Sequence, residues 1–571
     1  MTDVDPITLE VVKNALASTA DEMALVIMRS AYSPVVRDTL DYSTALCDRN
    51  GRIVAQGLTL AVQLGTFPTV MRHVLDELAP DAKPGDVYIA NDPYGCGGQH
   101  LPDIYVIKPV FVDGTLEGYA ATMAHHSDVG GIAPGSVAVH ATEIYQEGLR
   151  IPLSKLADAG VEDATLWRLL EANTRQPVHV LGDVRAQLAA CRVGERGLTA
   201  LVERYGAETH RYTDELQLVA ERTMRAELAA LPDGVRTFTD YIDGVGENPV
   251  PVPITVRVEI AGDEVVVDFE GTAPQVEASI NCPVGMVYAA CYCAFRGIAR
   301  AEIPNCEGYM APIRVHAPPG TVVNPVLPAA CGARGVIGYR VYDAIMGALA
   351  GLVPDRVIAA GEGGPTLVAF GGYDRDRRPF GTTEVLVGSW GARAARDGLE
   401  GVSNPLANLG NQPVELIEAD QPIRVERYGL VPDSGGAGRH RGGLAYVREY
   451  TVLAERATLT IRTDRRDHPP YGLAGGEPGA PSANVVVSRG ATRELPTMPM
   501  AADVLVQGDS YTHVSAGGGG FGAARERDPA AVLEDVLDGK VSVAAARERY
   551  GVVVADGAVD AGATAELRGA T

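Results

Sequence analysis

The sequence predicts a large multidomain protein that mixes helices and strands, of the α+β class. A chain of 571 residues is several times the length of an ordinary domain, so two to four hydrophobic cores are expected. Helical periodicity is confined to a few stretches, whereas 65 Gly and 37 Pro predict many turns and short strands, above all in the later half. Hydrophobic residues at 46% and charged residues at 21% are typical of a globular protein.

The first helix is predicted directly after Asp5 and Pro6, which supply a cap and a first helical residue. From Ile7 to about Ser30, apolar residues recur at the spacing of one helical face. Short segments bounded by Gly, Pro, Asn or Asp follow, among them "YSTALCD", "DVYIAND", "DIYVIKPVFV" and "GYAATMAHH", and they predict strands joined by turns. One further helix is expected near Thr69–Leu78.

Helical patterns return from Leu166 to Ala230, and "LPDGV" at 231–235 predicts a boundary. Alternating residues at 252–271 predict a hairpin that turns at Gly262 and Asp263, and similar strands recur between Tyr428 and Val487. The last helical stretch begins at a second Asp-Pro pair, at 528–529. We therefore expect an N-terminal α/β region with the candidate site at 1–230, a sheet-rich region at 231–510, and a Gly-rich loop with a C-terminal helical appendage at 511–571.

Charge and composition exclude several classes of partner. The 49 Lys and Arg against 73 Asp and Glu give a net charge of −24, so we expect neither nucleic acid nor an anionic membrane as a partner. The acidic start "MTDVDPITLE" differs from a basic signal peptide, and no run of about 18 apolar residues is present, so a cytoplasmic location is expected. The eight Cys form no paired CxxC units, which argues against a disulfide framework or a thiolate zinc finger.

Two clusters of His and Asp are the strongest candidates for a functional site. "HLPD" at 100–103 and "HHSD" at 125–128 fall at the ends of predicted strands, where rigid elements meet loops. Imidazole and carboxylate groups are common ligands of Zn²⁺. A zinc site without thiolates fits a hydrolytic role better than a purely structural one. The alternative is that these residues are hydrogen-bonded strand ends. Because side chains alternate along a strand, His125 and His126 are not expected to point toward the same metal ion.

Other motifs carry weaker signals. The Gly-rich stretches "DSGGAGRHRGG" (433–443) and "SAGGGGFGAA" (515–524) could offer backbone N–H groups to a phosphate, but turns and close backbone contacts explain such clusters more often. No GxxxxGK[ST] sequence occurs, and neither "DSGG" nor "GSWG" (388–391) completes a nucleophile motif. Cys96 is a candidate nucleophile in a Gly loop, although a bystander role fits it better. "CYC" at 291–293 fits a core segment better than a soft-metal site.

Taken in order, many segments resemble the hydantoinase B/oxoprolinase family over nearly the whole chain. The resemblance rests on "DYSTALCD" (41–48), "NDPYGCGGQHLPD" (91–103), "MAHHSDVGGIAPGS" (123–136), "TEIYQEGLRIP" (142–152), "GDVRAQLAA" (182–190), "DFEGTAPQVEASIN" (268–281), "GARAARDGLEGV" (391–402), "DSGGAGRHRGGLAYVRE" (433–449), "SAGGGGFG" (515–522) and "DVLDGKVSVAAARERYGV" (535–552). It implies a hydantoinase B-like fold and one subunit of an ATP-dependent enzyme, among them hydantoinases, 5-oxoprolinase, lactamases and acetone or acetophenone carboxylases. In that scheme an A-type partner in the same hetero-oligomer uses ATP and Mg²⁺ to phosphorylate a small substrate such as a cyclic amide.

By this resemblance the metal ligands are Asp41, His100, Asp103 and His125. The implied ion is Zn²⁺, with Mn²⁺ or Fe as alternatives. A metal-bound water would then open the phosphorylated cyclic amide at neutral pH. His126 and Asp128 are expected to be catalytic, by orienting ligands or by passing a proton.

Two positions near the expected site depart from the family pattern. The chain has Gln63 in "AVQLGTF", where many relatives have His, and "GCGG" follows "NDPY" in place of an Arg-containing run. These changes leave the metal expectation in place but weaken any assignment of the substrate. The leading hypothesis is the B-type subunit of an ATP-dependent cyclic-amide hydrolase. The alternatives are a subunit of the carboxylase branch and a scaffold subunit with a structural metal.

Overall fold

The computed structural model describes residues 4–362, 364 and 366–569. The first helix begins where Asp5 and Pro6 predict it. Helix α1 spans Pro6–Ser30, and the carboxylate of Asp5 accepts a hydrogen bond from the N–H of Thr8 at 3.0 Å. Its buried residues are spaced three or four apart along one face: Val12, Leu16, Ala20, Met23, Ala24 and Ile27. The predicted helix and its cap are confirmed.

Two units divide the chain, and neither is continuous in sequence. The first comprises the residues up to Val235 together with Arg257–Gly338 and Pro405–Gly410. The second comprises Arg236–Val256, Tyr339–Asn404 and the residues from Asn411 onward. These bounds differ from the three expected regions (1–230, 231–510 and 511–571), because residues 257–338 belong with the N-terminal residues. That assignment depends on long-range contacts, which leave no mark on local composition.

A seven-stranded sheet forms the centre of the first unit, in the order β2-β1-β5-β4-β3-β6-β7, and its neighbouring strands are antiparallel. The hairpin β4–β5 lies in the middle of this order, and Asp103 and His125 are opposite each other at its open end. The strands are β1 (Tyr42–Asp48), β2 (Ile53–Gln56), β3 (Val87–Ala90), β4 (Asp103–Val112), β5 (Thr115–His125), β6 (Ser154–Asp158) and β7 (Val161–Glu162). The predicted strands around the two His/Asp clusters are therefore confirmed.

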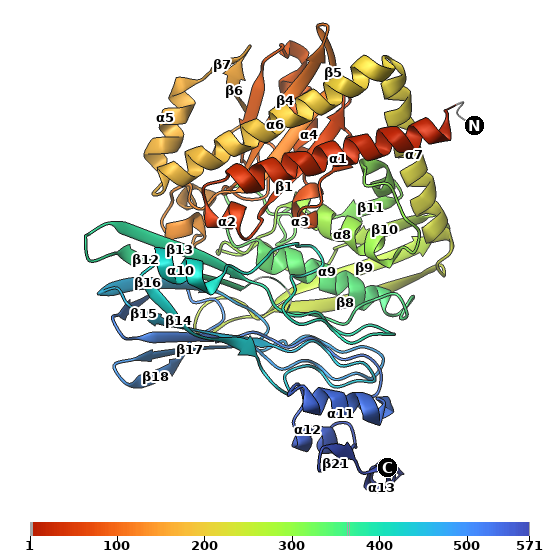
Figure 1. Ribbon diagram of the computed structural model, residues 1–571, viewed down its shortest axis with the longest axis vertical. Coiled ribbons are helices and arrows are strands. Elements are labelled where there is room, and N and C mark those ends of the chain that lie inside the picture. The colour runs from red at the N-terminus through yellow and green to blue at the C-terminus, as the bar shows by residue number, and fades with distance from the viewer. Residues whose placement is uncertain (1–3, 363, 365, 570–571) are drawn as a thin grey trace. The chain divides into compact units, whose positions relative to one another are not determined.

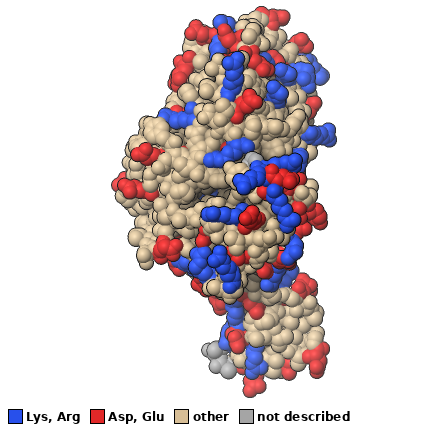
Figure 2. All heavy atoms as spheres, turned by 90° about the vertical axis from the view of Figure 1, so that its left-hand side faces the viewer, with Lys and Arg blue, Asp and Glu red and all other residues tan. Residues whose placement is uncertain are grey.

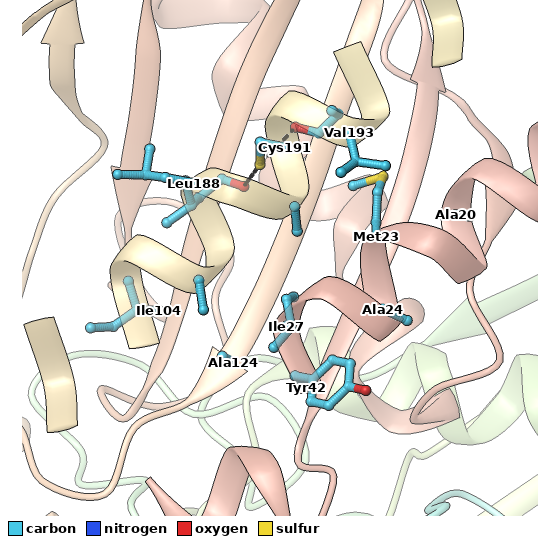
Figure 3. Close-up of a cluster of buried hydrophobic side chains, with 14 of the residues drawn as sticks. Ala20, Met23, Ala24, Ile27, Tyr42, Ile104, Ala124, Leu188, Cys191 and Val193 are labelled. Carbon is cyan, nitrogen blue, oxygen red and sulfur yellow. Dashed lines mark hydrogen bonds between the residues drawn. The ribbon is translucent and has the colours of Figure 1, made fainter. Parts of the chain in front are cut away.

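Helices cover both faces of this sheet, so its central strands are buried along most of their length. On one face α1 lies beside the long helix α6 (Pro177–Tyr205), as Figure 1 shows. Met23 of α1 lies next to Val193 of α6 in the core between them (Figure 3). On the other face α4 (Phe67–Glu77) packs its apolar side against the sheet, where the rings of Phe67 and Tyr105 meet edge to face at 5.7 Å. The two cores take alternate residues of β3, β4 and β5.

Most of the remaining predicted elements are also present. The helical stretch expected at 166–230 consists of α5 (Ala164–Asn173), α6 and α7 (Glu208–Ala229). The expected hairpin is formed by β9 (Val252–Ala261) and β10 (Glu264–Asp268), with Gly262 and Asp263 at its turn. It belongs to a sheet of order β11-β10-β9-β8. Further elements are α2 (Pro34–Arg37), α3 (Ala61–Leu64), α8 (Val284–Ile298), β8 (Gly234–Ile242), β11 (Ile313–His316), α9 (Gly335–Leu349) and the 3-10 helices η1 (Ala79–Asp81), η2 (Pro134–Ser136), η3 (Ile144–Gln146) and η4 (Glu307–Met310).

Two sheets that share one hydrophobic cluster build the core of the second unit. The first has the order β13-β12-β16-β19, and the second has the order β14-β15-β20-β17-β18. Their aromatic residues meet in the cluster, where the rings of Phe370 and Tyr450 lie 5.4 Å apart. The elements are β12 (Thr366–Tyr373), β13 (Pro379–Leu386), α10 (Val414–Asp420), β14 (Ile423–Leu430), β15 (Tyr446–Val452), β16 (Arg456–Arg462), β17 (Ala483–Ser488), β18 (Ala491–Glu494), β19 (Asp503–Val506) and β20 (Ser510–Val514).

The Gly-rich segments of the second unit pack directly on one another. The N–H of Gly436 donates to the carbonyl oxygen of Gly518, and the N–H of Gly518 donates to that of Gly443, both at 2.8 Å. A Cβ on Gly442 would lie 1.9 Å from the carbonyl oxygen of Gly518, so a larger residue does not fit there. Close backbone packing therefore accounts for these glycines, and the N–H groups of Gly436 and Gly518 are already used within the protein.

The C-terminal helices begin at the predicted Asp-Pro cap. The carboxylate of Asp528 accepts from the N–H of Ala530 at 2.9 Å at the start of α11 (Pro529–Leu537). The elements around it are η5 (Ala524–Glu526), α12 (Val543–Glu548), β21 (Val554–Ala555), β22 (Ala558–Val559) and α13 (Ala561–Gly569). Figure 2 shows one face of the molecule, on which acidic and basic side chains are interspersed. No helix within the described residues has both the length and the apolar character needed to cross a bilayer.

Candidate metal centre

The hairpin β4–β5 brings the two His/Asp clusters together. Asp103 is the first residue of β4 and His125 is the last of β5, and they form a cross-strand pair. His100 precedes β4 in a turn that is closed by a hydrogen bond from the N–H of Asp103 to the carbonyl oxygen of His100 at 3.0 Å. Directly opposed side chains on one sheet face are close neighbours. The register of one hairpin therefore places two residues from separate clusters at one point.

Three candidate ligand atoms converge at this point. One atom each from His100, Asp103 and His125 belongs to a group in which all atoms lie within 4.8 Å of one another. His100 Nε2 is 3.2 Å from Asp103 Oδ1, and the two imidazole rings are 4.9 Å apart between centroids. The exposed fractions of the three residues are 1%, 0% and 8%. The cluster is thus buried and dense in nitrogen and oxygen atoms.

Each of these three residues also has one buried side-chain atom without a hydrogen-bond partner. Nε2 of His100, Oδ1 of Asp103 and Nδ1 of His125 are each buried without a donor or acceptor at hydrogen-bonding geometry. Leaving such groups unpaired in a protein interior is costly, and three together are unusual. A divalent cation would satisfy all three, and two imidazoles with one carboxylate are a common protein donor set for Zn²⁺. The residues present therefore fit a metal ion.

Electrostatics keep these groups in the protonation states that a metal ligand needs. Burial and the guanidinium of Arg334 lower the pKa of His100 to about 4, and burial and His100 lower the pKa of His125 to about 3. Burial acts to raise the pKa of Asp103, but Arg334 and His100 outweigh it and hold that pKa below its usual range. At neutral pH the site therefore consists of two neutral imidazoles and one carboxylate.

A second set of residues holds Asp103 and His100 in place. Arg334 donates from Nη2 to Oδ2 of Asp103, the oxygen that is not part of the unpartnered group. The side-chain oxygen of Gln99 accepts from Nε and Nη2 of Arg334 at 3.1 and 2.9 Å. The carbonyl oxygen of Gly332 accepts from Nδ1 of His100 at 3.0 Å. Each contact leaves the inward-facing atom free, which is the arrangement that metal-binding side chains usually require.

Asp41 lies next to this cluster but its carboxylate is outside it. The carbonyl oxygen of Asp41 accepts from the N–H of His125 at 3.0 Å, so the two backbones are adjacent. Its Oδ1 accepts a hydrogen bond from Nε2 of Gln63 at 2.5 Å, and among the residues described here the carboxylate does not join the group of three. Gln63 is therefore a direct neighbour of a predicted ligand. The assignment of Asp41 as a fourth ligand stays a prediction.

The two residues predicted to be catalytic make their hydrogen bonds with partners outside the cluster. His126 is buried, and its Nε2 lies 3.1 Å from Oε1 of Gln187 on α6, as the alternation of side chains along a strand predicts. The carboxylate of Asp128 accepts from the N–H groups of Gly130 and Arg175, at 2.9 and 3.0 Å, and from Nη1 of Arg175 at 2.9 Å. Asp128 thus ties the loop after β5 to the start of α6. Their roles in proton transfer stay predictions.

The weaker motifs have structural explanations. Cys96 is buried, donates to the carbonyl oxygen of Asp92 at 2.9 Å, and has its pKa raised to about 12 by burial, which disfavours a nucleophilic thiolate. Cys291 is buried in α8, in agreement with a core role for "CYC". Asp433 of "DSGG" accepts from the N–H of Ser542 at 2.7 Å near the start of α12.

Sequence reasoning missed Arg334, Gly332 and Glu147. Arg334 and Gly332 come from "CGARG" at 331–335, far along the chain from His100, and the stretch carries no recognisable spacing. Glu147 contacts the same stretch by accepting from the N–H groups of Cys331 and Gly332. One signal was available for a further neighbour, because Gln99 directly precedes His100. The others became visible only once the chain was folded.

The sequence and the fold together define the class of protein to which this chain belongs. The sequence profile of the hydantoinase B/oxoprolinase family matches residues 5–524. The chain is 34% identical to the B component of a putative D-/L-hydantoinase of Pseudomonas sp. (strain NS671), with 99% of this chain and 98% of that one covered. It is also 34% identical to the beta chain of the caprolactamase of Pseudomonas jessenii, with 100% of both chains covered. This chain belongs to the hydantoinase B/oxoprolinase family.

Solved structures agree with this assignment. The crystal structure of the ATP-dependent caprolactamase from Pseudomonas jessenii matches with a TM-score of 0.92 and 32% identity over 100% of both chains. The nucleotide-free structure of acetone carboxylase matches with a TM-score of 0.91 over 99% of this chain and 83% of that one. Its identity of 19% shows a shared fold alone. The expected hydantoinase B-like fold is confirmed.

Proposed function

We propose that this chain is the B-type subunit of an ATP-dependent cyclic-amide hydrolase, with a divalent metal centre at His100, Asp103 and His125. The observation that carries the proposal is the convergence of three buried residues, each of which has a buried side-chain atom without a hydrogen-bond partner. The names of its relatives support the reaction class, since they include the B component of a hydantoinase and the beta chain of a caprolactamase.

The protein's own residues prepare the centre. Burial keeps His100 and His125 neutral, and Arg334 keeps Asp103 ionised, so all three can offer a lone pair at neutral pH. When bound there, Zn²⁺, or Mn²⁺ or Fe in its place, would supply Lewis-acid activation of a water molecule, whose pKa zinc can lower to about 7. Asp41 is the candidate fourth ligand, and its Oδ1 accepts a hydrogen bond from Gln63.

The proposal places ATP chemistry in a partner chain. The sequence has no GxxxxGK[ST] motif, and the N–H groups of Gly436 and Gly518 in the Gly-rich segments donate to carbonyl oxygens of the protein. An A-type subunit would use ATP and Mg²⁺ to phosphorylate the amide oxygen, which makes the carbon a better electrophile. The net change consumes two water molecules: one is added across the cleaved amide C–N bond, and the other accounts for conversion of one ATP to ADP and phosphate.

Reconstitution of the complex tests the proposal. The full chain would be combined with an A-type subunit, ATP, Mg²⁺ and Zn²⁺, and offered hydantoins, lactams and ketones with and without bicarbonate. We expect bicarbonate-independent release of ADP and ring-opened product from a cyclic amide. Turnover of a ketone that requires bicarbonate would instead assign the chain to the carboxylase branch.

A variant separates a catalytic metal from a structural one. Asp103→Ala should abolish turnover in a complex that still assembles and remains folded. A loss of activity that only follows a loss of stability would instead make the metal structural and the chain a scaffold. That outcome would refute the catalytic role of the centre.

A further inference from the structure

His100 presents its two ring nitrogens to two different surroundings. Nδ1 lies 3.0 Å from the carbonyl oxygen of Gly332. A carbonyl oxygen can only accept, so Nδ1 carries the hydrogen and Nε2 keeps its lone pair. Nε2 has no hydrogen-bond partner and faces Oδ1 of Asp103. The tautomer that Gly332 selects is therefore the one in which Nε2 can bind a cation.

The peptide that carries this carbonyl group is fixed from both sides. The N–H of Ala333, in the same peptide plane as the Gly332 carbonyl, donates to the carbonyl oxygen of Ser279 at 2.8 Å. On the other side, Oε1 of Glu147 accepts from the N–H of Cys331 at 2.9 Å and from the N–H of Gly332 at 2.6 Å. One carboxyl oxygen thus holds two successive backbone groups.

Glu147 is built into this position. It directly follows η3 and is 1% exposed. The backbone of η3 is joined to the 328–332 stretch, because the N–H of Ile144 donates to the carbonyl oxygen of Pro328 at 2.9 Å. A Cβ at position 332 would lie 2.9 Å from Oε1 of Glu147, so only glycine allows the carboxyl group to approach so closely. The fit between Glu147 and Gly332 leaves little freedom for the peptide to rotate.

We propose that Glu147 is a positioning residue for His100. Through the backbone of Cys331 and Gly332 it sets the direction of the Gly332 carbonyl, and thereby the tautomer and orientation of the imidazole. This inference rests on the proposed function in that it concerns the same metal centre. It assigns a role to the segment "TEIYQEGLRIP", which the proposed reaction does not otherwise use.

Zinc binding tests the effect on the site. The affinity of the full chain for Zn²⁺ alone would be measured by competition with a chromophoric chelator for the wild type, Glu147→Ala and Glu147→Gln. Loss of a residue that orients a metal ligand typically weakens binding about 10- to 100-fold, which is the result expected for Glu147→Ala. Glu147→Gln should bind nearly as the wild type does, because its amide oxygen can still accept from both N–H groups. The control is Glu307→Gln. Glu307 is another residue of the first unit whose carboxylate accepts from a backbone N–H, that of Ile53, at 3.0 Å.

The tautomer of His100 provides a readout that needs no metal. Nitrogen NMR of the zinc-free chain labelled with ¹⁵N-histidine would report it, with the His100 signal identified by its loss in His100→Ala. We expect Nδ1–H in the wild type and in Glu147→Gln, and a mixture of tautomers in Glu147→Ala. A wild-type His100 protonated on Nε2 would overturn the proposal even if Glu147→Ala failed to fold.

The two proposals fail in different ways. A folded Glu147→Ala with unchanged tautomer and unchanged zinc affinity would refute the role of Glu147 and leave the metal centre intact. A wild type that binds no zinc, in which the His100 tautomer still follows Glu147, would refute the metal centre and support the positioning role.

Discussion

Arg334 donates from Nη2 to Oδ2 of Asp103, whereas Oδ1 of the same carboxylate faces Nε2 of His100 at 3.2 Å. The two oxygens of one buried side chain therefore have separate tasks. One is held by a cation of the protein, and the other remains available to a cation that binds. We expect both the stability of the first unit and the proposed binding of a metal ion to depend on this division.

Arg334→Met should destabilise the metal-free protein. Removing one partner of a buried pair leaves the Asp103 carboxylate without a counter-charge, which costs about 3–5 kcal/mol. Urea unfolding of the full chain measures this loss. Arg314→Met is the control, since Arg314 is 67% exposed in its pair with Glu264, and such surface pairs contribute about 1 kcal/mol or less. Equal losses in the two variants would contradict a special role for Arg334.

Zinc should stabilise the wild type and not His125→Ala. A ligand that binds only the folded protein adds about 4 kcal/mol at a free concentration of roughly 1,000 times its dissociation constant. The measurement is the shift of the thermal midpoint on addition of Zn²⁺ to protein purified with a chelator. His179→Ala, which alters a histidine near the start of α6 that hydrogen-bonds to Gln176, should retain the full shift. A shift that survives in His125→Ala would place the bound zinc elsewhere.

Asp41→Ala should weaken zinc binding less than His125→Ala does. The Asp41 carboxylate lies outside the group of three and accepts a hydrogen bond from Gln63. A zinc ion could therefore keep three ligands without Asp41. We expect a loss of about tenfold for Asp41→Ala and of more than about a hundredfold for His125→Ala, by chelator competition. Equal losses would show that Asp41 is a full ligand in the metal-bound protein.

The second unit should lose stability with rising pH through Asp343. Burial raises the pKa of Asp343 to about 6, although Arg465 and Arg340 act against the shift. Between about pH 4 and pH 6, Asp343 is therefore still protonated in the folded chain but already ionised in the unfolded chain. The contribution of Asp343 to the unfolding free energy is thus fully present at low pH and is lost as pH rises through about 6.

For the full chain, the difference in unfolding free energy between wild type and Asp343→Asn should shrink by about 3 kcal/mol from about pH 4 to pH 7. Urea titrations at each pH measure it, with Asp538→Asn as an exposed control. A difference that grows with pH would contradict the raised pKa.

Gly442→Ala should destabilise the second unit strongly. The added methyl group would lie 1.9 Å from the carbonyl oxygen of Gly518, and overpacking of this kind costs roughly 1–3 kcal/mol or more. Gly429→Ala is the matched control, because a Cβ there meets nothing within 4 Å. Thermal unfolding of both variants should show a large loss for the first and little change for the second. Similar behaviour would mean that the Gly-rich segments can separate without cost.

Local sequence determined a large part of this protein. Asp5 and Pro6 fix the start of α1, Gly262 and Asp263 fix the β9–β10 turn, and alternation along β5 sends His125 and His126 to opposite sides. These features depend on residues only a few positions apart, and their physical causes act within one turn or one strand. Even the meeting of Asp103 with His125 follows from a single hairpin once its register is known.

Only the tertiary structure decided which residues complete the site. Arg334 reaches Asp103, and Gly332 reaches His100, from a segment far along the chain. Glu147 holds the N–H of Gly332, and Gln63 reaches Asp41 from a short helix. Their contacts arise because folding of the first unit buries polar groups that must then find partners. Burial of that kind is a property of the whole fold, so neither the spacing nor the composition of these segments announces it.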